Sequence, residues 1–318
     1  MKKRILVTGG AGFIGSHLVE SLLSDGAQVI CMDDLSTANP VNTKHLHSDG
    51  NFRFIKHDAI RPFSISRKVD EIYHLASPAS PKAYQEMPIK TLFSNSIGLH
   101  NSLNLARKHN AKLLYTSTSE VYGDPKISPQ HEGYYGYVNP IGPRSCYDES
   151  KRFGESLLVN FSRTFKVDAK IVRIFNTYGP QMKIDDGRAV PNFIYQSLKG
   201  EDITIYGNGN QTRSFCYISD MVSALKSMMA SNIVAEPINI GNPKEYCSIL
   251  QLAQKIKKIT GSKSRIIHGK MPKDDPIKRK PDITRARKLL KWQPKVNLDK
   301  GLGLTIDWFR EHLKEYHH

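Results

Sequence analysis

Two side chains in the sequence could together move a proton on and off a hydroxyl group. Tyr147 and Lys151 stand four residues apart in Y-D-E-S-K, a spacing that places both on one face of a helix. A tyrosine with its usual pKa of ~10 is a poor base at neutral pH, but an adjacent ammonium and a bound nicotinamide cation both favour the phenolate. The pair is weak evidence alone and needs a second motif.

That second motif is T-S-T-S-E-V-Y-G, residues 116–123, which sets one carboxylate, Glu120, behind hydroxyl side chains at the end of an apolar run. In a doubly wound α/β fold, the carboxyl ends of the strands line the ligand crevice. We therefore expect this segment beside a nicotinamide. Together with Tyr147 and Lys151, it predicts a site that oxidises a hydroxyl group.

A glycine-rich turn points to the cofactor. Gly9, Gly12 and Gly15 have G-x-x-G-x-x-G spacing in G-G-A-G-F-I-G, where they permit a tight turn and let a pyrophosphate rest on a helix N-terminus. Such a turn could also serve packing alone. Asp33 ends the second predicted strand, where a carboxylate accepts hydrogen bonds from ribose hydroxyls and repels a 2′-phosphate. With no Lys or Arg between Asp33 and Lys44, the predicted cofactor is NAD and not NADP.

Strand and helix patterns alternate around these motifs. Apolar strand patterns at RILVTGG, AQVICMDD, FRFIKHD, DEIYHLAS, KLLYTSTS and AKIVRIF alternate with helical stretches, among them 88–109 and 146–165. We predict an α/β fold with a doubly wound parallel (Rossmann) sheet in residues 1–175. Residues 176–318 carry Pro- and Gly-punctuated short elements, which predict a smaller mixed substrate lobe with some segments returning to the first domain.

The helical stretch 146–165 carries an aromatic and aliphatic series. Phe153, Leu157, Phe161 and Phe165 recur at intervals of four residues, which predicts a buried stripe along one face of the helix.

Composition and charge narrow the class of protein. The 318 residues are 24% charged, and the four cysteines lie far apart with no C-x-x-C pair, which argues against a zinc site and a disulfide framework. We find no signal peptide and no apolar run long enough to span a membrane, so we expect a cytoplasmic protein. Net charge is +16, and residues 251–300 hold 16 Lys and Arg against 4 Asp and Glu. A solvated surface is the favoured interpretation of that stretch, ahead of attraction for an anionic substrate and of nucleic-acid binding.

The sequence resembles the extended short-chain dehydrogenase/reductase family and, within it, the UDP-glucuronate decarboxylases (UDP-xylose synthases). The resemblance covers nearly the whole chain. It rests on long consecutive motifs: GGAGFIGSHL, HLASPASP, TSTSEVYGDP, NPIGPRSCYDESKR, RIFNTYGP, DGRAVPNFI, YGNGNQTRSF and DDPIKRKPDI.

The resemblance implies particular site residues. It implies NAD contacts from Gly9, Gly12, Phe13, Ile14, Gly15, Asp33, Asp34, Thr37, Asp58, Ala59, Leu75, Ser77, Thr116, Tyr147 and Lys151. It implies UDP-sugar contacts from Asn176, Arg188, Asn192, Tyr206, Arg213 and Arg279, with Arg213 as the best diphosphate clamp by its chemistry. No metal is expected.

The resemblance also implies a mechanism. Tyr147 removes the 4-hydroxyl proton of UDP-glucuronate while NAD takes the hydride from carbon 4, and the resulting β-keto acid loses carbon dioxide. Tyr147 and Thr118 hold the ketone oxygen while it gains charge. Glu120 is expected to organise reprotonation of carbon 5, with Arg279 or a water, before NADH returns its hydride to give UDP-xylose.

Comparison within the family accounts for the lone Glu120. Sugar-nucleotide 4,6-dehydratases carry an Asp-Glu pair here, because expelling water needs an acid, whereas this chain has Ser119 before Glu120. Epimerases usually lack the carboxylate. The role of Arg279 stays open between holding diphosphate and positioning a water, because clamping the substrate carboxylate would stabilise the ground state and oppose its loss.

Alternative functions remain at this point. The chain could be an oxidative relative that releases a 4-keto-pentose and NADH, a dehydratase or epimerase, or a non-catalytic NAD-binding sensor. The intact Tyr147, Lys151 and Glu120 speak against the sensor. By resemblance we also expect a homodimer formed through the helices near 88–109 and 146–165, with the stripe partly serving that contact.

Overall fold

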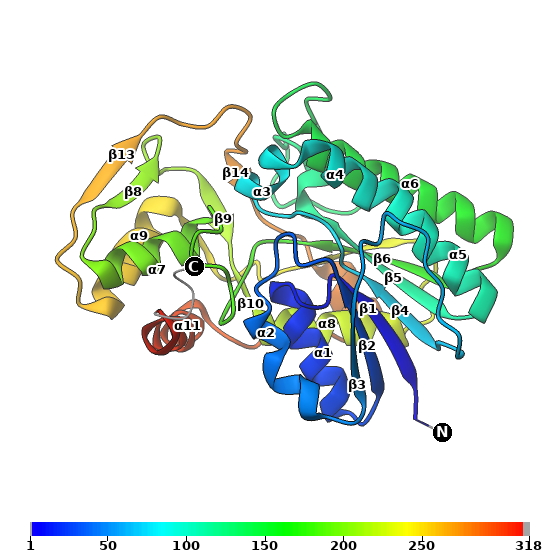
Figure 1. The fold of residues 1–318 in the computed structure, drawn as a ribbon. Coiled ribbons are helices and arrows are strands. Elements are labelled where there is room, and N and C mark those ends of the chain that lie inside the picture. The colour runs from blue at the N-terminus through cyan, green and yellow to red at the C-terminus, as the bar shows by residue number, and fades with distance from the viewer. Residues whose placement is uncertain (1, 314–318) are drawn as a thin grey trace.

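Seven parallel strands form the central sheet of the computed structural model, which describes residues 2–313 (Figure 1). In spatial order they are β11 (Pro237–Ile240), β6 (Ala169–Ile174), β5 (Lys112–Thr118), β4 (Glu71–His74), β1 (Arg4–Thr8), β2 (Gln28–Asp33) and β3 (Phe52–Lys56). The chain starts at β1, runs outward to β3 and then crosses back to β4. This reversal between β1 and β4 makes a topological switch point. The predicted doubly wound parallel sheet is confirmed.

Helices cover both faces of the sheet, so its strands are buried on both sides. Ile5 and Val7 of β1 pack into one hydrophobic cluster and Leu6 between them packs into another. Two helices in contact, α1 (Phe13–Ser24) and α8 (Ile218–Ala230), cover the first face. On the other face lie α5 (Leu99–His109) and α6 (Ser145–Phe165). The predicted helix 88–109 is continuous but passes from α4 (Pro88–Phe93) to α5 through a π-helical turn, η2 (Ser94–Gly98).

Several short elements lie outside both the seven-stranded sheet and the second lobe. They are α2 (Val41–Lys44), η1 (His45–Ser48), α3 (Pro81–Glu86), η3 (Ser119–Tyr122), β7 (Thr177–Tyr178) and β10 (Cys216–Tyr217). The lobe itself contains α7 (Ala189–Lys199), β8 (Ile203–Tyr206), β9 (Thr212–Ser214), β12 (Tyr246–Ser248), α9 (Ile249–Thr260), β13 (Ile266–Gly269), β14 (Lys278–Arg279) and α11 (Leu298–His312). Helix α10 (Thr284–Leu290) instead contacts β11 and α8 of the first domain.

The lobe is built from two small sheets and packed helices. Strand β8 pairs with β13, and β9 lies between β12 and β14. Phe193, Leu252 and Phe309 belong to the same hydrophobic cluster as Val7 of the central sheet. One core therefore runs through both lobes and fixes how they face each other.

Segments beyond residue 176 complete the first domain. Strand β11 pairs with β6, and α8 packs against α1. We keep the division near residue 175 as a proposal, with α8 and β11 assigned to the first domain.

The basic stretch 251–300 is in part neutralised by ion pairs at the surface. Lys255 pairs with Asp299 at 2.5 Å and Arg265 pairs with Asp202 at 2.7 Å. Arg279 is an exception, since it is buried with 1% exposure. Within residues 2–313, no helix is both long enough and apolar enough to cross a membrane.

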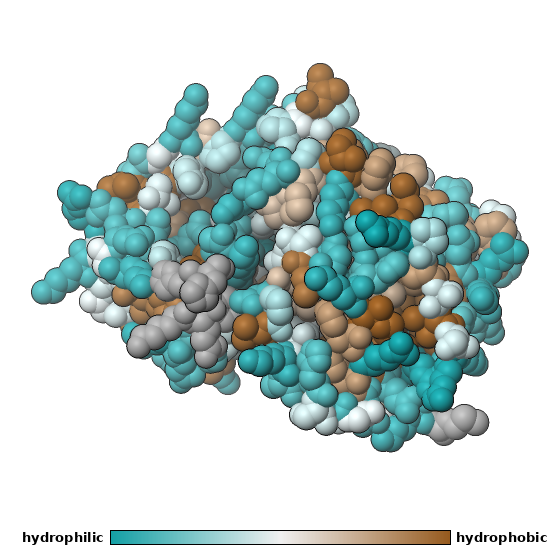
Figure 2. Space-filling view, in the orientation of Figure 1, coloured by the Kyte–Doolittle hydropathy of each residue, from teal (hydrophilic) through white to brown (hydrophobic). Residues whose placement is uncertain are grey.

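The predicted stripe on α6 is buried only in part. Phe161 is 6% exposed, but Phe153 is 53% exposed and Phe165 is 40% exposed. Because an α-helix has about 3.6 residues per turn, side chains four apart rotate around its axis by roughly 40° at each step. The ends of the series therefore leave the core face. Apolar surface gathers on the α4 and α6 side of the molecule (Figure 2), where Ile89 and Phe93 of α4 are also exposed.

Candidate active site

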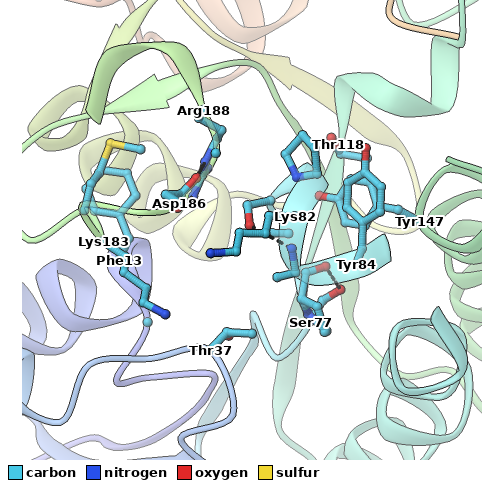
Figure 3. A pocket seen from close by; sticks show the side chains of 18 of the residues that line it. Phe13, Thr37, Ser77, Lys82, Tyr84, Thr118, Tyr147, Lys183, Asp186 and Arg188 are labelled. Atoms are coloured by element: carbon cyan, nitrogen blue, oxygen red, sulfur yellow. Dashed lines mark hydrogen bonds and ion pairs between the residues drawn. The ribbon is translucent and has the colours of Figure 1, made fainter. Parts of the chain in front are cut away.

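A cavity of about 810 Å³ lies between the sheet and the second lobe, at the carboxyl ends of the central strands (Figure 3). Its walls bring together every predicted NAD contact. They also include Thr118, Glu120, Tyr147 and Lys151 from the first domain and, from the later part of the chain, Asn176, Arg188, Asn192, Tyr206 and Arg213. Tyr147 and Thr118 face Arg188 and Asp186 across the opening in Figure 3.

The glycine turn packs the start of α1 tightly against β1. A Cβ on Gly15 would lie 2.1 Å from the carbonyl oxygen of Gly9, and Gly9 has a φ of +71°. Gly12 begins α1 without a side-chain cap. Because Gly12 supplies no side-chain cap, the N–H groups and the positive dipole end of α1 can meet a pyrophosphate.

Asp33 is set firmly at the end of β2. Its carboxylate accepts hydrogen bonds from the backbone N–H of Ala11 at 3.0 Å and of Leu35 at 2.8 Å. Burial raises the pKa of Asp33, and these N–H groups act in the opposite direction. The glycine turn and Asp33 thus supply the two groups that a dinucleotide needs, one for pyrophosphate and one for ribose, and the residues present fit NAD.

Tyr147 and Lys151 lie side by side in α6, both buried. The ring of Tyr147 stacks on Tyr84 with centroids 5.0 Å apart, and Lys151 Nζ donates to the carbonyl oxygen of Thr116 at 2.7 Å. Burial raises the pKa of Tyr147 to about 12, although a hydrogen bond from Thr118 opposes the shift. Burial lowers the pKa of Lys151 to about 7. Burial thus favours the neutral form of both groups.

Glu120 is the carboxylate at the end of β5, and two arginines bind it. Its backbone N–H donates to Thr118 Oγ1 at 3.2 Å where β5 passes into η3. One oxygen, Oε2, accepts from Arg144 and, at 3.1 Å, from Arg279. Burial favours the neutral acid, but the charges of Arg279, Arg144 and Arg213 hold the pKa of Glu120 at about 2. Glu120 is therefore ionised at neutral pH and by itself holds no proton to donate.

Residues 5–241 match the family described as the NAD-dependent epimerase/dehydratase family. The chain belongs to this family. Over 98% of its length it is 51% identical to UDP-glucuronic acid decarboxylase 1 of Xenopus tropicalis, of which it covers 73%. Over 97% of its length it is 49% identical to UDP-glucuronic acid decarboxylase 2 of Arabidopsis thaliana, of which it covers 68%.

A solved structure from the same family supports the fold and the cofactor. The UDP-glucuronic acid 4-epimerase of Bacillus cereus, in complex with UDP-glucuronic acid and NAD, superposes with a TM-score of 0.86 at 30% identity, covering 97% of this chain and 99% of that one. The resemblance predicted from the sequence motifs is confirmed, and the chain is an enzyme of the NAD-dependent epimerase/dehydratase family.

Arg279 is the one predicted site residue of this chain that does not line the cavity. It lies behind Glu120 and off the cavity wall, with 1% exposure, and its Nε and Nη1 atoms have no hydrogen-bond partner among the described residues. The predicted contact of Arg279 with substrate stays a prediction, and in the structure its guanidinium donates a hydrogen bond to Glu120. Arg213 does reach the cavity, where it donates to Asp275 Oδ2 at 2.9 Å.

Sequence reasoning missed Lys90, which lies at the ribose end of the family's NAD site. Its Nζ binds Asp34 and lies 3.5 Å from Asp58. The carboxylates of Asp34 and Asp58 neutralise the Lys90 ammonium, so it is not available to bind the 2′-phosphate of NADP. No motif indicates this residue, because the contact joins α4 to the end of β2.

Arg144, Asp148 and Asp275 were also missed. Arg144 and Asp148 stand inside NPIGPRSCYDESKR, and Asp275 stands inside DDPIKRKPDI, so both motifs contained the signal. Arg144 Nη1 lies 3.5 Å from Asp275 Oδ1. These residues link the first domain to the segment that leads into β14.

Proposed function

We propose that this protein is an NAD-dependent UDP-glucuronate decarboxylase that forms UDP-xylose through a transient 4-keto intermediate. The observation that carries the proposal is the lone ionised carboxylate beside Tyr147. Glu120 is held by two arginines, and its neighbour toward β5 is Ser119, which donates a hydroxyl hydrogen bond to Glu120 at 3.4 Å. A dehydratase needs an acid at that position to expel water, and serine is not one. The names of the curated relatives support the same activity.

The residues divide the work as follows. When bound, NAD accepts the hydride of carbon 4 and later returns it. Tyr147 takes the 4-hydroxyl proton, and the hydroxyls of Tyr147 and Thr118 then hold the ketone oxygen as it gains charge during loss of carbon dioxide. Lys151, fixed by the carbonyl of Thr116, places its charge beside the phenol. Asn176, Arg188, Asn192, Tyr206 and Arg213 are proposed to hold the UDP part.

Turnover should produce no net NADH. Because the hydride taken from carbon 4 returns to the same carbon, absorbance in the NADH band should stay flat while carbon dioxide is released from UDP-glucuronate. UDP-glucose, which has no carboxylate, is the control and should release none. NADH that grows in step with a 4-keto-pentose product would instead identify an oxidative decarboxylase.

We also propose a homodimer formed through α4, α5 and α6. The support is the exposed apolar surface there, which includes Ile89, Phe93, Phe153 and Phe165 with exposures from 40% to 59%. Contiguous apolar surface of this kind marks interaction sites on soluble proteins. The second copy covers it by presenting the same face, as a two-fold interface requires.

Light scattering should report twice 35.9 kDa for the wild-type chain. Phe153→Glu places a charge in the centre of the proposed contact and should give a monomer. Ile267→Glu, a matched change at an exposed position of β13, should leave the dimer intact. A wild-type protein that is monomeric at micromolar concentration, or a Phe153→Glu variant that stays dimeric, would refute this interface.

We further propose a reducing, cytoplasmic location. Cys31, Cys146, Cys216 and Cys247 are all free thiols in the structure, as is usual for proteins kept in reducing compartments.

A further inference from the structure

The proposed reaction consumes a proton that the residues assigned so far do not supply. Loss of carbon dioxide from the sugar carboxylate leaves carbon 5 one proton short. The proton that Tyr147 takes from the 4-hydroxyl is needed again when the hydride returns. Glu120 is ionised, and an arginine does not release a proton at neutral pH. A further source of this proton is therefore needed near Glu120.

Asp148 has the position of that acid. It follows Tyr147 in α6 and is 6% exposed. Its Oδ2 lies 3.9 Å from Arg144 Nε, while the same guanidinium binds Glu120 through Nη2. Two carboxyl groups thus share one arginine, and Glu120 has the closer contact. Asp148 Oδ1 and Arg144 Nε are both buried without a hydrogen-bond partner among the described residues.

This geometry favours one proton on the pair. A buried ionised Asp148 would leave an oxygen unsatisfied beside the negative charge of Glu120, which is costly. Burial, reinforced by Glu120, raises the pKa of Asp148 to about 8, although Arg144 and Arg279 oppose the shift. The groups whose charge or ionisation acts on Asp148 or responds to it are Glu120, Arg144, Arg279, Glu149, Tyr84, Tyr147 and Cys146. Since the two carboxyls interact, their proton belongs to the pair and not to one residue.

We propose that Glu120 and Asp148 form a carboxyl pair that holds a single proton at neutral pH, and that this proton replaces the departing carboxylate at carbon 5. The proposal rests on the function proposed above. Asp148 stores the proton while Arg144 and Arg279 bind Glu120. Glu120 is the member of the pair that lines the cavity. When a substrate carboxylate binds there, it competes with Glu120 for the positive charge of the surrounding arginines. This competition raises the affinity of Glu120 for a proton.

The step balances in atoms and electrons. The bond between carbons 5 and 6 breaks, carbon dioxide leaves, and the electron pair moves to the oxygen on carbon 4. Carbon 5 then takes the proton from the pair, and solvent returns one proton to the pair after each turnover. Asp148 acts through Glu120 and is therefore a positioning residue in this scheme.

The test is a single-turnover experiment on the NAD-bound enzyme with UDP-glucuronate across pH 6 to 10, the range that brackets the pair's upper titration at about 8. Enzyme-bound NADH, carbon dioxide and UDP-xylose are measured separately. In the wild type, we expect the ratio of the rate of UDP-xylose formation to the rate of bound-NADH formation to be highest at low pH. The ratio should fall as the pH rises through about 8, because the carboxyl pair then loses its proton. Asp148→Asn should form bound NADH at the wild-type rate, form UDP-xylose ~10²-fold more slowly and lack this alkaline fall.

Two variants control for structure. Glu149→Gln, at a neighbouring carboxylate paired with Arg152 at 3.4 Å, should keep the wild-type rate at low pH. It should also keep the alkaline fall, moved to somewhat lower pH, because the charge of Glu149 helps to raise the pKa of Asp148. Asp148→Glu should restore much of the rate. An Asp148→Asn enzyme with the wild-type rate and pH profile would overturn the proposal, whereas a wild type that releases no carbon dioxide would overturn the proposed function itself.

A measurement on the wild type alone guards against a variant that does not fold. Infrared difference spectra between pH 6.5 and pH 9.5, which lie on either side of the pair's titration at about 8, should show a protonated carboxyl band that disappears on the alkaline side. Absence of a protonated carboxyl at neutral pH would overturn the proposal equally.

Discussion

Tyr147→Phe should stop turnover of UDP-glucuronate before any intermediate forms. The variant keeps the ring that stacks on Tyr84 at 5.0 Å, so the cavity and its NAD contacts should persist. It removes the hydroxyl that accepts the 4-hydroxyl proton, and loss of a general base typically costs ~10²–10⁴ in rate. The effect here should reach the upper end of that range, because the same hydroxyl also holds the ketone oxygen during decarboxylation.

The measurement is single-turnover formation of enzyme-bound NADH. Tyr147→Phe should show none above background while still binding NAD. Tyr137→Phe, at a tyrosine that is 62% exposed, is the matched control and should oxidise substrate normally. Oxidation at the wild-type rate in Tyr147→Phe would remove Tyr147 from the chemistry.

Glu120→Gln should separate oxidation from product formation. The first oxidation depends on Tyr147, Lys151 and NAD, so bound NADH should still form. UDP-xylose formation should slow by ~10²–10⁴, the range of a group that acts in proton transfer. The change also leaves Arg144 and Arg279 buried without their common anion. Breaking a buried ion pair in this way is strongly destabilising, so the thermal midpoint should fall as well.

A different result would identify a simpler role. If Glu120 only anchors a sugar hydroxyl, its loss should mainly raise KM and leave kcat intact. A Glu120→Gln enzyme that decarboxylates and reprotonates at the wild-type rate would contradict the proton-transfer role.

The fold was predictable because its determinants are local. Apolar strand patterns alternating with helices indicate a parallel sheet, and the glycine turn with Asp33 locates the dinucleotide at its edge. The cavity lining that surrounds Tyr147 and Glu120 was likewise predictable from motifs, since the carboxyl ends of parallel strands converge. The sequence also indicated the lone carboxylate, whose setting became visible only in three dimensions.

What could not be predicted depends on contacts between distant segments. Lys90 meets Asp34 because α4, which packs on α6, brings it to the end of β2. Arg144 meets Glu120 through a long connection between β5 and α6. The position of Arg279 behind Glu120 follows from the pairing of β14 with β9. On α6, the apolar residues do recur every four positions, but this spacing rotates them around the helix axis. Phe153 and Phe165, at the two ends of the series, are therefore exposed.

The most direct test of the central claim is the mass of the product formed from UDP-glucuronate. The purified enzyme with NAD should convert the substrate to a UDP-pentose, with one carbon dioxide released for each molecule consumed and the sugar identified as xylose by comparison with a standard. A product that keeps the mass of UDP-glucuronate, as epimerisation would give, or that has lost only water, as dehydration would give, would contradict it.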